Sequence, residues 1–415
     1  MIANRIINNE EKWSAVADEI TAHGGDGKAV SEALKELYSV YTEDMLVWLG
    51  RLFDSRIGGF YYSLSAKDSD GYLPDIESTY QAIVFLRSAG LISEYRDIPE
   101  AIRKKIAGFI CSLEDPDSGY FYHPQWSREL TNEKVSRKGR DLTWATFLSS
   151  GLGFDLPYPS AYARLDKGGL DTDTYENKIL SSEEAFLSYL KEQDFDKDYT
   201  RAFHRVISLS DQITHAGLGA ALIDYLDGIQ RDNGFWRDEP DLGSACAFWG
   251  VAALYNNLSR PLKNADKVAE YIINELFCSG KIFEIDGIWL LRNVWGALHT
   301  LIENIRKFGV GAERAEELLD MIMKKAPTAI LATASKLAEF RKPTGAFSMN
   351  VNDSPTTSQG VPVAPENTVG GDMNATAIAV GMIRSIKCLL HINGVGLNLF
   401  EPEDLKKFTN EIKFI

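Results

Sequence analysis

The sequence predicts an all-α protein, an (α/α)6 toroid of inner and outer helices with little or no β-structure. One pattern recurs along the chain: a Gly-aromatic turn, a variable loop, an aspartate and then an apolar helix. An amphipathic segment precedes most of these turns, and hardly any segment requires a strand. About six such hairpins would bury their apolar faces only against neighbours, and closing them into a ring removes exposed ends.

The copies of this repeat supply the predicted inner helices. They cover residues 54–86, 115–153, 230–255, 279–301 and 344–383. Their inner helices are expected to begin near Asp75, Asp141, Asp241, Gly287 and Asp372, and a sixth candidate lies within residues 203–218. These segments are apolar nearly all round and rich in Ala, Gly and Ser, as is typical of helices packed on every side.

The predicted outer helices have one polar face. Residues 98–113, 217–230 and 264–277 place apolar side chains at intervals of three and four, as an amphipathic helix requires. Residues 1–45 are predicted to form an N-terminal helical lead-in, and residues 46–415 a single toroid domain.

A long polar loop interrupts the last copy of the repeat. Residues 344–371 are punctuated by Pro and Gly and are too many for a plain connection. We expect this loop to form a lid that carries Gln359 and Glu366.

Composition limits the classes of function. The 415 residues are 45% hydrophobic and 25% charged, as in a globular protein with a large core. A formal charge of -15 repels phosphate backbones and anionic membrane surfaces, so nucleic acid is not an expected partner. Without a signal-peptide pattern or an apolar stretch of spanning length, we expect a cytoplasmic protein with no membrane span. No CxxC pair or histidine lies at ligand spacing, so neither a metal site nor a cofactor is expected.

The repeat resembles that of the protein prenyltransferase and squalene cyclase superfamily. In that superfamily a glutamine or similar residue, a short turn, Gly-Gly-Phe and an inner helix recur around an α/α toroid. The likeness is closest in LDGIQRDNGFWRDEPDLGSACAFWGVAALY, where Gln230, Gly234, Phe235 and Trp236 stand in the expected order. It covers most of residues 50–392 and lies in scaffold positions, so it implies the fold far more than the activity.

Two functional motifs of this superfamily are matched in part. In RKGRDLTWATFLSSGLG, Asp141 matches the aspartate zinc ligand of protein prenyltransferases, but Thr143 stands where a cysteine ligand is needed. DIESTYQA is similar to the Asp-x-Asp-Asp-Thr-Ala acid motif of class II terpene cyclases. Asp75 aligns with the first acid, while Glu77 and Ser78 replace the central and third acids.

The aspartates at the inner helices have two possible roles. Such an aspartate can simply cap its helix by accepting hydrogen bonds from free N–H groups, which contributes about 0.5–2 kcal/mol. In a toroid, however, the inner helices run the same way, so their N-terminal acids converge on one rim. Crowded carboxylates raise one another's pKa, which suits acid and base chemistry. The candidate catalytic residues are Glu77, Asp75, Asp141 and Asp372.

Aromatic and polar residues are expected to surround the same rim. Tyr and Trp faces stack on sugar rings and also shield carbocations, so they indicate a site without selecting its chemistry. Arg140 is either an anchor for a substrate anion or the partner of Asp141, and Arg292 needs a rim acid or a ligand carboxylate as its partner. The candidate substrate-binding residues are Tyr62, Tyr72, Tyr122, Trp126, Arg140, Trp144, Trp236, Asp241, Arg292, Gln359 and Glu366.

Three functions fit these features. The first is a carbohydrate-active enzyme of the glycoside hydrolase, lyase or epimerase type, which would use carboxylates in the funnel on a small-molecule or oligosaccharide substrate. The architecture is also similar to that of the six-hairpin glycosidases, which include unsaturated uronyl hydrolases and sugar 2-epimerases. The alternatives are a terpenoid cyclase or prenyltransferase-like enzyme, which needs a dry, apolar cavity, and a noncatalytic toroid that binds a glycan or protein. The oligomeric state stays open.

Overall fold

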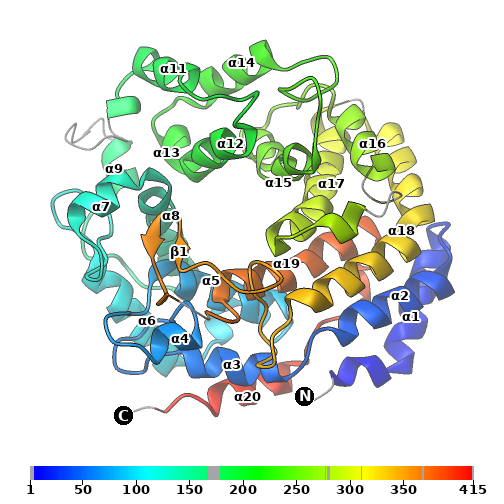
Figure 1. The fold of residues 1–415 in the computed structure, drawn as a ribbon, viewed down its shortest axis with the longest axis horizontal. Helices are drawn as coiled ribbons and strands as arrows, with labels where there is room; N and C mark the ends of the chain where they lie inside the picture. The colour runs from blue at the N-terminus through cyan, green and yellow to red at the C-terminus, as the bar shows by residue number, and fades with distance from the viewer. Residues whose placement is uncertain are drawn as a thin grey trace.

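The described part of the protein is almost entirely helical (Figure 1). The computed structural model describes residues 4–166, 178–275, 277, 281–309, 311–366 and 369–413. Within these ranges the only sheet pairs two short antiparallel strands, β1 (Thr357–Ser358) and β2 (Val361–Pro362). The predicted all-α class is confirmed. No helix within the same ranges is both long enough and apolar enough to cross a membrane.

Six helices contact one another in a closed cycle, which we call the inner ring. Its members are α5 (Ile76–Ser88), α8 (Val135–Leu152), α12 (Tyr199–Ser208), α15 (Leu242–Asn257), α17 (Ile288–Phe308) and α19 (Met373–Leu389). Each helix contacts the next member along the chain, and α19 returns to contact α5. Figure 1 shows these helices around a common centre, as an (α/α)6 toroid requires of its inner helices.

Outer helices alternate with the inner ring along the chain. They are α3 (Asp44–Leu52), α6 (Glu100–Leu113), α11 (Glu183–Lys191), α14 (Gly219–Ile229), α16 (Ala265–Glu275) and α18 (Ala312–Phe340). In Figure 1 each lies farther from the centre than the inner helix that follows it. Their amphipathic patterns are satisfied: α6 buries Ile102, Ile106 and Ile110 and exposes Lys104 and Lys105.

The segments at both ends of the chain pack onto this ring of hairpins. The lead-in contains α1 (Glu10–Ala22) and α2 (Gly27–Ser39), and α2 packs against α18. At the other end, α20 (Leu405–Thr409) packs against α3. The remaining short helices are η1 (Arg5–Asn8), α4 (Leu64–Lys67), η2 (Tyr95–Asp97), α7 (Arg128–Glu133), α9 (Ala161–Leu165), α13 (Ser210–His215), η3 (Lys281–Glu284), η4 (Asn393–Val395) and η5 (Pro402–Asp404).

The Gly-aromatic turns share one pattern of backbone hydrogen bonds. In the first turn, the N–H of Gly58 donates to the carbonyl of Asp54, and the N–H of Asp54 donates to the carbonyl of Gly59. The same pair of bonds forms at Gly119, and turns one residue shorter form corresponding pairs at Gly234 and Gly345. All four turn glycines have positive φ angles, which residues with a Cβ rarely adopt. The repeat therefore encodes a structural turn between outer and inner helices.

The aspartates that follow these turns begin three of the inner helices as predicted. The side chains of Asp75, Asp241 and Asp372 accept hydrogen bonds from N–H groups in the first turns of α5, α15 and α19. Gly287 directly precedes α17, also as predicted.

The predicted start near Asp141 is wrong, because α8 begins six residues earlier, at Val135. Tertiary contacts hold this polar stretch in the helix: Arg137 and Lys138 are buried. Gly139 lies so close to the next inner helix that a Cβ there would come 2.7 Å from the carbonyl oxygen of Ser208. Packing therefore overrides the local sequence signal.

We predict that Gly58→Ala destabilises the protein more than Gly71→Ala. Both glycines have positive φ, which costs an alanine about 1–2 kcal/mol. A Cβ at Gly71 meets no atom within 4 Å, whereas one at Gly58 would lie 2.1 Å from the carbonyl oxygen of Lys105. We expect this overlap to lower the free energy of unfolding by a further ~1–3 kcal/mol, measured by urea denaturation. Equal losses in the two variants would contradict the close approach of the turn to α6.

Candidate functional site

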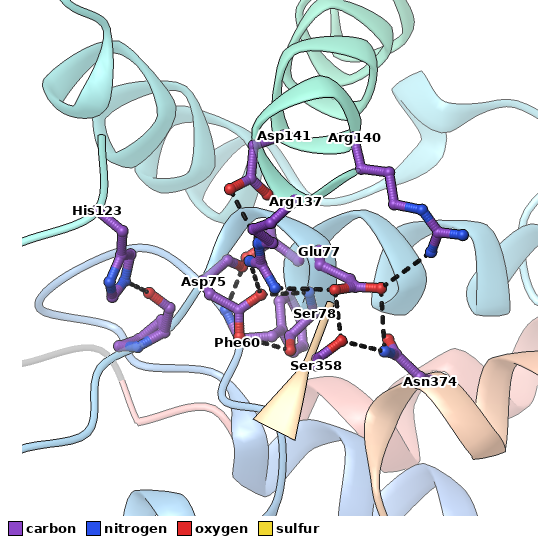
Figure 2. Close-up of polar contacts among 12 residues, drawn as sticks. Phe60, Asp75, Glu77, Ser78, His123, Arg137, Arg140, Asp141, Ser358 and Asn374 are labelled. Carbon is purple, nitrogen blue, oxygen red and sulfur yellow. Dashed lines mark hydrogen bonds and ion pairs between the residues drawn. The ribbon is translucent and has the colours of Figure 1, made fainter. Parts of the chain in front are cut away.

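A buried arginine joins three of the predicted catalytic carboxylates (Figure 2). Arg137 donates from Nε to Asp141 at 2.9 Å, from Nη1 to Glu77 at 2.8 Å and from Nη2 to Asp75 at 2.9 Å. None of these four side chains is more than 4% exposed. The guanidinium also lies over the ring of Trp126, 4.6 Å from its centroid. We call Arg137, Asp75, Glu77 and Asp141 the Arg137 cluster.

Local helix geometry explains how the cluster is assembled. Asp75 caps α5, and Glu77 lies in the first turn of the same helix. Arg137 and Asp141 are four residues apart on α8, so their side chains share one face of that helix. Because α5 and α8 are neighbours in the inner ring, the two pairs meet between them.

Glu77 receives donors from three elements besides its own helix. Its Oε2 accepts hydrogen bonds from Arg137 on α8 and from the hydroxyl of Ser358 in β1, at 2.8 Å. Its Oε1 accepts from the amide of Asn374 on α19 at 3.0 Å, and it lies 3.6 Å from Nη1 of Arg140. Figure 2 shows all four side chains directed at this carboxylate. Glu77 therefore interacts across the ring elements instead of capping its own helix.

Asp75 has both roles that the sequence left open. One oxygen accepts from the N–H of Ser78 at 2.9 Å and from Arg137, and the other accepts from the Ser78 hydroxyl at 2.8 Å. The same carboxylate thus caps α5 and belongs to the Arg137 cluster.

Asp141 is the carboxylate of this cluster with the fewest donors. Three carboxylates share one guanidinium, which leaves an excess of negative charge among the four groups. Oδ1 of Asp141 is buried and has no hydrogen-bond partner in the described part of the chain. Burial raises the pKa of Asp141 from its usual 3.8 to about 7, although Arg137 opposes this shift. Asp141 is therefore the member of the cluster that takes up a proton as the pH falls.

Asp372 lies beside the cluster at the start of α19. It accepts a hydrogen bond from the N–H of Ala375 at 2.8 Å and another from the hydroxyl of Ser354. Burial raises its pKa to about 7, while hydrogen bonds, including one with Tyr62, lower it. The pKa of Tyr62 is itself raised by burial and then by Asp372, Glu77 and Asp75, so this tyrosine lies among the acids. The four predicted catalytic acids thus occupy one region.

Asn374 and Glu77 occupy equivalent positions in two copies of the repeat. Asn374 is two residues after the capping Asp372, and Glu77 is two residues after the capping Asp75. The following threonines, Thr79 and Thr376, also make matching hydrogen bonds to the Gly-aromatic turns before them. Sequence comparison within the repeat could therefore have identified Asn374.

The predicted lid segment contacts the Arg137 cluster. Ser358 of β1 reaches Glu77, and the carbonyl of Pro362 in β2 accepts a hydrogen bond from Nε1 of Trp126 at 2.8 Å. Gln359, between the two strands, lines a cavity of about 440 Å³ together with residues of α8, α11 and α12, and none of the four acids lines this cavity. Glu366 is exposed to solvent.

Several predicted substrate-binding residues lie elsewhere. Trp236 was expected at the rim, but it is buried among aromatic rings, and its Nε1 donates to the carbonyl of Leu226 at 2.9 Å. Asp241 is exposed and pairs with Arg237 at 2.8 Å, so it caps α15 without joining the other acids. Trp236 and Asp241 belong to the copy of the repeat at residues 230–255, whereas the Arg137 cluster is formed by the copies at residues 54–86 and 115–153.

The two remaining rim tyrosines have ordinary packing roles. The ring of Tyr122 lies 4.0 Å from the guanidinium of Arg128, and its hydroxyl donates to Asn132 at 2.9 Å. Tyr72 is half-buried against the core.

Arg140, Trp144 and Arg292 belong to a second group on the inner ring. Trp144 stacks on Tyr80 with ring centroids 5.3 Å apart, and the guanidinium of Arg140 lies 5.4 Å from the Trp144 centroid. Arg292 lies over Trp249, 3.6 Å from its centroid. Arg140 connects the two groups, because it also approaches Glu77.

Sequence reasoning missed Arg137, Ser358, Asn374 and His123. The sequence pattern placed the helix start at Asp141, which left Arg137 outside the helix. Because α8 starts at Val135, Arg137 lies one turn before Asp141. His123 is held against the residue before Asp75, with Nε2 2.7 Å from the Pro74 carbonyl. Burial lowers the pKa of His123 to about 4, so the neutral ring donates this bond at neutral pH.

The Arg137 guanidinium occupies the position that a cation would need between these carboxylates. Across the described residues, no three His, Cys, Asp or Glu side chains are arranged to hold a metal ion. The chemistry available to this arrangement is proton transfer, nucleophilic attack by a carboxylate and electrostatic binding.

We predict that Arg137→Met strongly destabilises the protein at neutral pH. The variant leaves Asp75 and Asp141 without a counter-charge and Glu77 with Arg140 alone, so the free energy of unfolding should fall by about 3–5 kcal/mol. The loss should be smaller at pH 5, because a proton on Asp141 relieves the repulsion. Arg128→Met is the control, since Arg128 is half exposed and its pair with Asp115 contributes about 0–1 kcal/mol. Urea denaturation followed by circular dichroism measures both, and similar losses would argue against the cluster.

We also predict that Asp141→Asn makes stability less dependent on pH. The folded-state pKa of Asp141 is raised to about 7, so between about pH 4 and 7 the native protein binds a proton that the unfolded chain releases. Its contribution to stability is complete below the unfolded pKa and disappears as the pH rises through about 7. The wild type should therefore lose up to ~1.4 kcal/mol per pH unit from this group, and the variant should lack this slope. Parallel stability profiles between pH 4 and 8 would show that Asp141 stays ionised.

Comparisons with known proteins leave the function open. No protein-family model matches the sequence, and neither a curated protein nor a solved structure is significantly similar to it. The resemblance to the prenyltransferase and squalene cyclase superfamily therefore remains an expectation from sequence motifs. A function for this chain has to be inferred from the chemistry of its own residues.

Proposed function

We propose that the protein is a carbohydrate-active enzyme in which Glu77 is the reacting carboxylate. The observation that carries this proposal is the convergence of Arg137, Ser358, Asn374 and Arg140 on Glu77 from three other elements. A glutamate needs no such set of partners to support the first turn of a helix. Donors fixed around a carboxylate are typical of a group held in position for chemistry.

Glu77 would act as the ionised partner of the reaction, as a base or a nucleophile. Its Oε1 lies toward Arg140, which is half-buried and so accessible to a ligand, whereas Glu77 itself is only 2% exposed. A sugar that binds beside Arg140 would therefore lie next to this oxygen. Low exposure keeps water from competing with the substrate.

Asp372 would supply the proton. Its pKa of about 7 allows the carboxyl group to hold a proton near neutral pH, and Tyr62 connects it with the region of Glu77. Hydrolysis, elimination or epimerisation of a sugar requires one carboxyl group that gives a proton and a second that acts as a base or nucleophile. Asp75 and Arg137 would position Glu77 and would not react.

The terpenoid alternative is less well supported. Protonation of an isoprenoid requires an apolar wall around the reacting carbon, but Arg140 and Arg292 place charged groups on the faces of the inner ring next to Trp144 and Trp249. These groups favour a polar ligand. A noncatalytic glycan-binding role would not require the raised pKa of Asp372, whereas acid catalysis would use it.

We predict that Glu77→Gln abolishes turnover and leaves the fold intact. Loss of the reacting carboxylate should lower kcat by about 10²–10⁴-fold, measured on whichever member of a panel of neutral and acidic oligosaccharides the wild type converts. Asp241→Asn is the matched control, because asparagine also caps helices and Asp241 pairs with Arg237 instead of a member of the Arg137 cluster.

Wild-type kcat in the Glu77→Gln variant would remove Glu77 from the mechanism. Binding of an oligosaccharide by the wild type without any turnover would instead support the noncatalytic alternative. Conversion of prenyl diphosphates, tested in the same way, would support the terpenoid alternative.

A further inference from the structure

Arg292 is a half-buried arginine of the inner ring with no acidic partner among the described residues. It lies in the first turns of α17 and is half-buried. Its guanidinium rests on the ring of Trp249, and Nη1 donates to the side-chain oxygen of Asn293 at 2.9 Å. Throughout the residues that the structure describes, no carboxylate forms an ion pair with it. Arg137, by contrast, has three such partners.

This arrangement is costly for a charged group. Burial lowers the pKa of Arg292, and only Tyr80 opposes the shift. A guanidinium nevertheless stays charged in proteins, so its charge is partly removed from water without a counter-ion. An anionic ligand at this position would supply the missing charge.

Arg140 provides a second cation near the same place. Burial lowers its pKa, although Glu77 opposes this, and its Nη2 lies 3.0 Å from Nε2 of His204. Burial and then Arg140 lower the pKa of His204 to about 4, so the neutral ring can accept this hydrogen bond in its Nδ1–H form. His204 therefore orients Arg140 without neutralising it.

Tyr80 lies near enough to both arginines for each to affect its pKa. Burial raises its pKa to about 12, and both Arg292 on α17 and Arg140 on α8 oppose that shift. Tyr80 itself lies on α5, and α8 and α17 are not neighbours in the cycle of helix contacts. Charges from two other inner helices therefore reach Tyr80, and the Tyr80 ring stacks on Trp144, which lies beside Arg140. Asp211 is also close enough to affect Tyr80, but its Oδ2 accepts from the Thr143 hydroxyl at 2.9 Å.

Aromatic rings lie beside both cations. Tyr80 stacks on Trp144, and Trp249 lies under Arg292. The close approach of Trp249 depends on Gly296, where a Cβ would come 2.6 Å from Cδ1 of the indole. Flat rings beside guanidinium groups suit a sugar ring that carries a negative group. We call Tyr80, Arg140, Trp144, His204, Trp249 and Arg292 the belt.

We propose that the belt binds the anionic group of an acidic sugar, with Arg292 as its main anchor and Arg140 as the second. The negative group is a carboxylate or a phosphate, because both accept two hydrogen bonds from a guanidinium. This proposal deepens the proposed function by naming the substrate class, and its carbohydrate part rests on that function. The anion site itself rests on the unpaired arginine and its neighbours.

Isothermal titration calorimetry of the full chain tests the proposal. The probes are D-glucuronate, D-glucose 6-phosphate, inorganic phosphate and, as the neutral match, D-glucose. We expect at least one charged sugar to bind at least tenfold more tightly than glucose. Comparison of glucuronate with glucose 6-phosphate and inorganic phosphate distinguishes a carboxylate from a phosphate as the preferred group.

Arg292→Met should weaken binding of the charged sugar at least tenfold, and Arg292→Lys should retain part of it. The control, Arg128→Met, removes an arginine that is paired with Asp115 outside the belt and should bind like the wild type. The melting temperature of Arg292→Met should not fall below that of the wild type, because the substitution breaks no ion pair among the described residues.

Three results would overturn the anion site: no binding of any charged probe, equal binding of glucose, or unchanged affinity in Arg292→Met. Failure of the proposed function looks different. Binding of a charged sugar that depends on Arg292, without turnover of any sugar, would keep the anion site and reject the enzyme. Turnover of neutral sugars that is retained in Arg292→Met but lost in Glu77→Gln would keep the enzyme and reject the anion site.

Discussion

The buried guanidinium of Arg137 is the interaction on which the rest of the site depends. Three carboxylates from two neighbouring inner helices lie within hydrogen-bonding distance of it, so α5 and α8 are fixed in both separation and register. Without this cation, the acids would repel one another in a region that water hardly reaches. A structural ion pair would require one carboxylate. The two additional acids make the cluster negative overall and leave Asp141 able to take up a proton.

Glu77 extends this constraint from the ring to the segment that covers it. Ser358 in the short β-hairpin and Asn374 on α19 both donate to Glu77, so the hairpin is attached to the same carboxylate that Arg137 holds. Trp126 adds a second attachment, because its indole bonds to Pro362 while its face lies against Arg137. Movement of the hairpin would therefore change the donors of Glu77. The position of the hairpin therefore determines both access to Glu77 and the hydrogen bonds that Glu77 accepts.

Much of the fold could be predicted from sequence because its signals are local. A glycine with positive φ and a capping aspartate each act within a few residues, so the turns and the starts at Asp75 and Asp372 follow from the repeat. The prediction of a helix start near Asp141 was wrong, because buried contacts of Arg137 keep the polar residues before Asp141 helical. Convergence of the acids could be anticipated from ring geometry. Their partners could not, since Ser358 is 281 residues from Glu77 in the chain.

The charges on the inward side of the ring are distributed unevenly, and this gives the site a direction. Arg137 has more acids than it can neutralise, whereas Arg292 has none among the described residues and rests only on an indole and an amide. Arg140 lies between these extremes, 3.6 Å from Glu77 and bonded to a neutral histidine. A ligand with a negative group at one end would lower the electrostatic energy near Arg292 and keep that group away from the acids. Its other end would then lie toward Arg140 and Glu77, so the charges that attract such a ligand would also orient it toward Glu77.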